Sequence, residues 1–166
     1  MDEAGFSLAL FLFYGWALRE ERLAESVPLN RGKNLSVLGA FSCDGMIAQV
    51  NKVSAMKRVD VERFLESDLL PKLPAGSFLV LDNARIHKGG RIEEIVANAG
   101  CSLLYLSPYS PDFSPIELAW SWIKQCVRRL CPRDEDARRE AVESAIATLP
   151  KDYTKSWFDK CGYTLH

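Results

Sequence analysis

Two acidic residues lie at positions where an α/β protein could carry catalytic or metal-binding side chains. Asp82 directly follows a short apolar run, residues 78–81, with Asn83 beside it and His87 five positions further along. Open α/β sheets place their sites at the carboxyl ends of strands, and carboxylates are good oxygen ligands for hard divalent cations. Asp and Asn also favour turns and helix caps, so position alone leaves a purely structural role for Asp82 open.

Glu117 is the second candidate, near the start of a helix that we expect over residues 115–130. The segment 114–117, Ser-Pro-Ile-Glu, matches a capping box, in which the glutamate would only reach back to the backbone. At about 100° per residue, Glu117 projects opposite the expected apolar stripe and on the same side as Lys124 and Arg128. That polar face is either simply solvated, or it places an acid at a metal ion and cations near phosphates. The expected stripe consists of Ala119, Trp122, Ile123, Cys126 and Leu130.

Alternating strands and helices must position these side chains. Apolar runs and turn signals predict strands over residues 7–14, 35–42, 46–50, 78–81 and 103–106. Helical spacing predicts helices over residues 59–70, 92–99, 115–130, 134–148 and 155–160. The first three strands predict an antiparallel meander, and the later strand–helix–strand order predicts a parallel pair. We therefore expect an α/β fold with a mixed sheet flanked by helices.

The composition limits the class of protein. With 166 residues and 48% hydrophobic content, the chain fits one soluble domain. Five cysteines without a CxxC pair and only two histidines argue against a zinc site or a disulfide framework, so we expect reduced thiols and a cytoplasmic protein. The apolar run 8–14 is too short to cross a membrane. A net charge of −1 gives no support for nucleic-acid binding.

Two longer motifs resemble a known family. Residues 81–87, Leu-Asp-Asn-Ala-Arg-Ile-His, and residues 106–117, Leu-Ser-Pro-Tyr-Ser-Pro-Asp-Phe-Ser-Pro-Ile-Glu, are followed by Trp120. Together they resemble the DDE-superfamily transposases of bacterial insertion sequences related to mariner. The two acids are separated by 34 residues, 83–116, which is the spacing this family uses for its second and third acids. The opening Met-Asp-Glu-Ala-Gly-Phe resembles the family's first-acid motif, so the resemblance spans nearly the whole chain.

The resemblance implies a ribonuclease-H-like fold and a metal-dependent endonuclease. Carried over to this sequence, the catalytic and metal-binding acids are Asp2, Asp82 and Glu117, which would hold two Mg²⁺ or Mn²⁺ ions. Two such ions roughly 3.5–4 Å apart can activate a water and stabilise a leaving oxygen. The implied reactions are DNA cleavage at transposon ends and strand transfer. Asn83 and His87 match positions near the acids, where His87 either orients a ligand or only packs.

The implied partners are DNA, contacted by Lys124 and Arg128 among others, and a second copy of the complete protein; no membrane or small-molecule substrate is expected. Since only Met1 precedes Asp2, we expect residues 1–166 to be a single catalytic domain. We expect it to lack an N-terminal DNA-binding domain and part of the first strand, with Asp2 at a frayed end. Two alternatives stay open: an inactive truncated remnant, and a ribonuclease-H-like nuclease without strand transfer.

Overall fold

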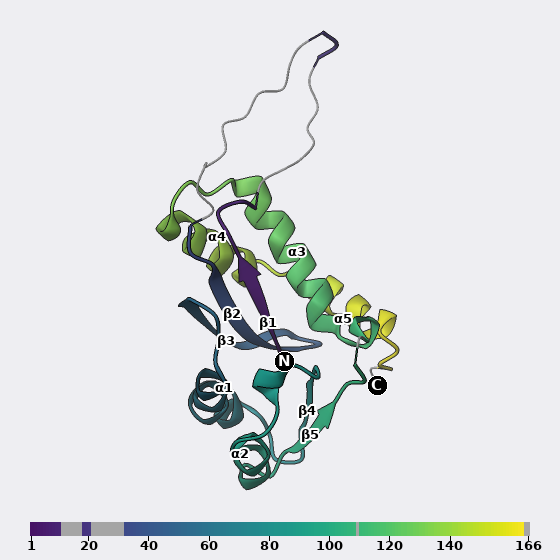
Figure 1. The fold of residues 1–166 in the computed structure, drawn as a ribbon. Coiled ribbons are helices and arrows are strands. Elements are labelled where there is room, and N and C mark those ends of the chain that lie inside the picture. The colour runs from purple at the N-terminus through teal and green to yellow at the C-terminus, as the bar shows by residue number, and fades with distance from the viewer. Residues whose placement is uncertain (11–17, 21–31, 109, 165–166) are drawn as a thin grey trace.

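The computed structural model describes residues 1–10, 18–20, 32–108 and 110–164 (Figure 1). The strands are β1 (Asp2–Phe6), β2 (Leu35–Ser42), β3 (Gly45–Val53), β4 (Phe78–Leu81) and β5 (Ser102–Tyr105). The helices are α1 (Arg58–Phe64), α2 (Ile92–Asn98), α3 (Pro115–Leu130), α4 (Glu135–Ala147) and α5 (Lys151–Lys160). A π-helical turn (Leu65–Leu69) and three 3₁₀ turns (Leu70–Lys72, Arg85–His87 and Pro111–Phe113) complete the elements. No helix in these ranges is long and apolar enough to cross a membrane.

The strands form an antiparallel group and a parallel pair. β1, β2 and β3 are hydrogen-bonded in that order and antiparallel, whereas β4 and β5 are parallel. The backbone nitrogen of Met1 donates to the Val80 carbonyl at 2.8 Å, which joins the start of β1 to β4. In Figure 1 the N-terminus accordingly lies beside β4. The predicted α/β fold, an antiparallel meander followed by a parallel pair, is confirmed.

Alternating side chains of β2 divide the hydrophobic core between two faces of the sheet. Leu35 and Val37 belong to the cluster that includes α3 and α4, whereas Leu38 and Ala40 belong to the cluster with α1, α2 and β4. This is the period-two pattern of a strand covered on both faces. Figure 1 shows α3 running alongside β1, with α1 and α2 on the other side of the strands. The start of β1 and the end of β4 therefore lie where the two clusters meet.

The prediction of a first strand over residues 7–14 is wrong where the structure describes it. The strand is β1, residues 2–6, and residues 7–10 form a turn; residues 11–14 lie outside the described ranges. Buried Ala4 and Phe6 alternate with more exposed Glu3 and Gly5, as expected of a strand with one face on the core. The continuous apolar run that follows gave a stronger local signal than this alternation.

Candidate active site

Asp82 follows β4 and is held by the residues immediately after it. Its side chain is about half exposed, and its Oδ1 accepts a hydrogen bond from the Ala84 backbone nitrogen at 3.1 Å. His87, which is 1% exposed, donates from Nδ1 to the same oxygen. These contacts lower the pKa of Asp82 below its usual value, with the His87 hydrogen bond as the largest cause and burial opposing it. Asp82 is thus an oriented, ionised carboxylate at neutral pH.

Glu117 lies in the first turn of α3 and lines the same cavity as Asp82. This cavity has a volume of about 430 Å³ and is also lined by Asn83 and Ser114. The Ser114 side chain, at the N-cap of α3, makes no capping hydrogen bond, so the serine half of the capping box is not formed. The glutamate side chain is exposed, and it borders a polar cleft together with a second acid.

Asp2 is buried at the start of β1, with 8% of its surface exposed. Its backbone pairs with Gly39 of β2, and Met1 before it is bonded to β4. The expectation that Asp2 lies at a frayed end is therefore wrong, because backbone hydrogen bonds on both sides fix this end of the strand. Opposite residues of an antiparallel pair project on the same face, so the Asp2 side chain lies on the face of the sheet that α3 covers.

The three acids interact electrostatically. The pKa of Asp2 is raised from 3.8 to about 6, first by burial, then by the negative charges of Glu117 and Asp82, while a hydrogen bond from the Glu3 backbone acts in the opposite direction. Like charges raise a carboxylate's pKa in this way only over short separations. A divalent cation among these groups would relieve both the repulsion and the cost of burying the Asp2 charge.

The position of α3 depends on a contact between Trp120 and Gly39. A Cβ atom added at Gly39 would lie 2.9 Å from Cη2 of Trp120 and 3.0 Å from Sδ of Met46. The indole therefore rests directly on the β2 backbone, opposite Asp2 in the strand register. This contact sets the distance of Glu117, one turn earlier on α3, from the sheet. No local sequence pattern indicates this contact, because it joins residues that are far apart in the chain.

The bounds of α3 agree with the prediction, but the predicted stripe is only partly correct. Leu130 is 60% exposed, and Trp122 and Cys126 are only half-buried. At about 100° per residue, the centre of the observed buried face lies roughly 110° from Glu117 rather than opposite it. Glu117 thus flanks the buried face, which directs it toward the edge of the core where β1 and β4 meet. The buried residues are Pro115, Ile116, Ala119, Trp120, Ile123 and Val127.

The remaining predicted residues lie in two places. Asn83 lines the acidic cavity, and its Oδ1 is buried without a hydrogen-bond partner. His87 lies behind Asp82, as described above. Lys124 and Arg128 are half-buried on α3, on the same side of the helix as Glu117, and at 1.5 Å per residue they follow it by about 10 Å and 16 Å along the axis.

The donor types suit a hard divalent cation, since two carboxylates and an unpartnered amide oxygen line the cavity and a third carboxylate, Asp2, is coupled to both acids. In the part of the chain that the structure describes, no group of three or more His, Cys, Asp or Glu side chains is close enough to hold one ion together. Asp82 and Glu117 line one cavity, and Asp2 interacts with both through its charge. The residues therefore fit metal ions chemically, with Asp2 and Asp82 held more firmly than Glu117.

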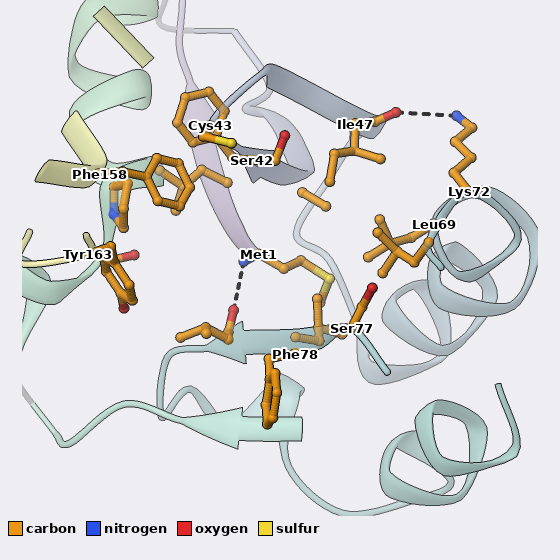
Figure 2. A pocket seen from close by; sticks show the side chains of 18 of the residues that line it. Met1, Ser42, Cys43, Ile47, Leu69, Lys72, Ser77, Phe78, Phe158 and Tyr163 are labelled. Carbon is orange, nitrogen blue, oxygen red and sulfur yellow. Dashed lines mark hydrogen bonds between the residues drawn. The ribbon is translucent and has the colours of Figure 1, made fainter. Parts of the chain in front are cut away.

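A second cavity lies next to the acidic one and has a different character. Figure 2 shows this space, of about 490 Å³, with Met1, Phe78, Phe158 and Tyr163 around it. Its wall is mostly apolar, it contains none of the three acids, and it shares Ser114 with the acidic cavity. The smaller cavity is the candidate site, because Asp82, Glu117 and the unpartnered oxygen of Asn83 line it.

Comparison with known proteins identifies the family. A model of the DDE superfamily endonucleases matches residues 1–138. Among solved structures, the fold is similar to a Mos1 transposase paired-end complex with the left transposon end, with a TM-score of 0.79 and 15% identity over 96% of this chain and 50% of that chain. The Mos1 strand transfer complex gives a TM-score of 0.73 and 14% identity over 96% of this chain and 49% of that chain.

A Mos1 mariner paired-end complex with Mn is also similar, with a TM-score of 0.70 and 12% identity over 96% of this chain and 51% of that chain. The chain thus spans about half the length of the transposase chains it matches. A search of curated proteins finds no match. Since the family model covers most of the chain and the fold agrees over nearly all of it, the chain belongs to the DDE superfamily endonucleases and has their ribonuclease-H-like fold.

Proposed function

We propose that this chain is the catalytic domain of a DNA transposase, in which Asp2, Asp82 and Glu117 hold divalent metal ions for phosphodiester cleavage and strand transfer. The observation that supports the proposal is that Asp82 and Glu117 share a cavity while Asp2 is electrostatically coupled to both. Both charges raise the pKa of buried Asp2. A buried carboxylate repelled by two others is unfavourable for folding alone, and clusters of this kind are typical of functional sites.

Each acid has a distinct part in this proposal. Asp82 is kept ionised and oriented by His87, and it offers a fixed oxygen ligand. Asp2 is fixed by the β1 backbone, whereas exposed Glu117 can adjust its side chain. Two Mg²⁺ or Mn²⁺ ions, when bound, would supply the activation of a water and the stabilisation of the leaving oxygen. Asn83 contributes an unpartnered oxygen in the same cavity.

DNA and a second copy of the chain are the proposed partners. The structural relatives are named as transposases in paired-end and strand transfer complexes, and DNA at transposon ends is the substrate that we propose for this chain. Lys124 and Arg128 continue the line of Glu117 along α3, so they would meet the phosphates next to the scissile bond. We propose that the part of a complete transposase that this chain does not span adds DNA and dimer contacts, so the chain by itself binds ends weakly.

The test replaces Asp82 with Asn and Glu117 with Gln, which removes the charges and keeps the shapes. We expect both variants to remain folded, as melting curves would show, but to lose Mg²⁺- or Mn²⁺-dependent cleavage of DNA that carries the ends of the encoding element. Glu140→Gln, an equivalent change at an exposed residue of α4, should cleave as the wild type does.

A pre-cut end supplied with target DNA separates the proposed reactions. Joining of that end supports a transposase, whereas cleavage without joining would indicate a nuclease without strand transfer. Normal cleavage by either acid variant would refute the assignment. If Glu117 acted only as a helix cap, its loss would instead lower stability by about 0.5–2 kcal/mol.

A further inference from the structure

We propose that Tyr105 is a positioning residue for the metal site, because its hydroxyl holds the main-chain carbonyl of His87 and thereby fixes the ring that orients Asp82. This inference rests on the proposed function, since it assigns Asp82 to a metal ion. Tyr105 is the last residue of β5 and lies opposite Leu81 in the parallel register. It thus lies on the strand beside the one that presents Asp82.

The contacts behind Asp82 form a chain. Both hydrogen bonds described for this carboxylate, from Ala84 and from the His87 ring, go to Oδ1. Oδ2 is then the oxygen left to face a cation in the cavity. The direction of the carboxylate therefore depends on where the His87 ring lies.

The His87 backbone is held locally and from outside. Locally, the His87 backbone nitrogen donates to the Ala84 carbonyl at 3.0 Å. The Lys88 backbone nitrogen donates to the Arg85 carbonyl at a longer 3.4 Å. From outside, the Tyr105 hydroxyl donates to the His87 carbonyl at 2.8 Å. A single 3₁₀ turn has weak hydrogen-bond geometry of its own, so the external bond limits how far the turn can tilt. Metal ligands need placement within about 0.5 Å.

The Tyr105 hydroxyl has two acceptors for its single proton. The His87 carbonyl is at 2.8 Å and Oε1 of Glu93, on the exposed face of α2, is at 3.2 Å. Burial, and then the Glu93 charge, raise the pKa of Tyr105 to about 12, so the hydroxyl remains a donor at working pH. The shorter and less exposed contact is the one with His87. Lys88 lies 5.7 Å from the centre of the Tyr105 ring and further restrains it.

Histidine labelled with ¹⁵N gives a direct measurement, because the chain has only two histidines, His87 and His166. A His166→Gln variant assigns the two ring signals. We expect the wild type to show a downfield, slowly exchanging Nδ1 proton for His87, as expected when that nitrogen donates to a carboxylate. In Tyr105→Phe this signal should broaden and move upfield. Mn²⁺ affinity, measured by titration of the free ion's EPR signal, should fall up to about tenfold, the lower end of losses from outer-sphere changes.

Two control variants separate positioning from packing. Glu93→Gln keeps the Tyr105 hydroxyl and removes the competing charge, so the His87 signal and the Mn²⁺ affinity should remain at wild-type values. Tyr163→Phe removes a hydroxyl that also donates to a backbone carbonyl at 2.8 Å, that of Phe113. Tyr163→Phe should lower the melting temperature about as much as Tyr105→Phe does, but it should leave the His87 signal unchanged.

An unchanged His87 signal or an unchanged Mn²⁺ affinity in Tyr105→Phe overturns the inference, as does an equal loss in Glu93→Gln, which would assign the effect to the docking of α2. The failure of the proposed function has a different signature. In that case Asp82→Asn would bind Mn²⁺ as the wild type does, whereas failure of the Tyr105 inference alone leaves Asp82→Asn impaired and Tyr105→Phe normal.

Discussion

Replacing Asp2 with Asn should stabilise the metal-free protein at neutral pH. The pKa of Asp2 is raised from 3.8 to about 6, with burial as the largest cause and the charges of Glu117 and Asp82 next. At about 1.4 kcal/mol for each pH unit, ionising Asp2 in the folded protein costs about 3 kcal/mol more than in the unfolded chain. Asparagine has nearly the same shape without the charge. For a domain of this size, the gain corresponds to a rise in melting temperature of at most roughly 6–12 °C.

The pH dependence gives the sign of the effect. Between pH 3.8 and about 6 the unfolded chain has released the Asp2 proton and the folded protein retains it. The folded state binds more protons, so the free energy of unfolding contributed by this group falls as pH rises through that window and is constant above it. The difference between Asp2→Asn and the wild type should therefore be near zero at pH 4 and complete at pH 7.

The assay is thermal or urea unfolding of both proteins from pH 4 to pH 8 with a chelator present, repeated with Mg²⁺. Added Mg²⁺ should stabilise the wild type, because ion binding to the folded state favours folding, and should have much less effect on Asp2→Asn. Glu3→Gln is the matched control on the same strand, since it keeps an acceptor for the Met56 backbone nitrogen and should show neither effect. A difference between Asp2→Asn and the wild type that is the same at pH 4 and pH 7 would refute the reasoning.

Two further predictions concern α3 and the DNA. Gly39→Ala should lower stability by about 1–3 kcal/mol through overpacking and reduce cleavage by moving α3. Gly5→Ala should be mild, because the atoms nearest to its new methyl belong to the exposed Asn34 side chain. Equal losses for the two variants in unfolding and cleavage assays would contradict the assigned contact. Replacing both Lys124 and Arg128 with Ala should reduce the slope of log affinity against log salt by about 2, roughly one per lost phosphate contact, with no such change expected when a cation on another side of α3 is replaced.

The sequence predicts those parts of the fold that have strong local signals. The apolar run Phe78–Leu81 is β4, and α3 begins at Pro115 as the fixed φ of proline predicts. The motifs also predict that Asp82 follows a strand and that Glu117 lies at the start of a helix. In each case neighbouring residues alone specify the element.

Long-range packing explains what the sequence did not predict. β1 contains two acids and a glycine, so the apolar residues after it gave the stronger strand signal, although pairing with β2 makes residues 2–6 the strand. The observed buried face of α3 is rotated relative to the predicted stripe, because Trp120 packs on Gly39 and is buried, while Leu130 is exposed. The hydroxyl bond from Tyr105 to His87 likewise joins two segments that no local pattern relates.

The three acids differ in how firmly they are held, and this difference bears on how ions would bind. Asp2 is fixed by sheet hydrogen bonds and Asp82 by His87, whereas Glu117 is exposed on the first turn of α3. A glutamate has three rotatable side-chain bonds, so its carboxylate can move by several ångströms while the helix stays in place. We expect ion binding to begin at the two fixed acids and to draw Glu117 in. Glu117→Gln should therefore weaken Mn²⁺ binding less than Asp82→Asn does, although both abolish cleavage, and the reverse order of affinities would show that Glu117 is the primary ligand.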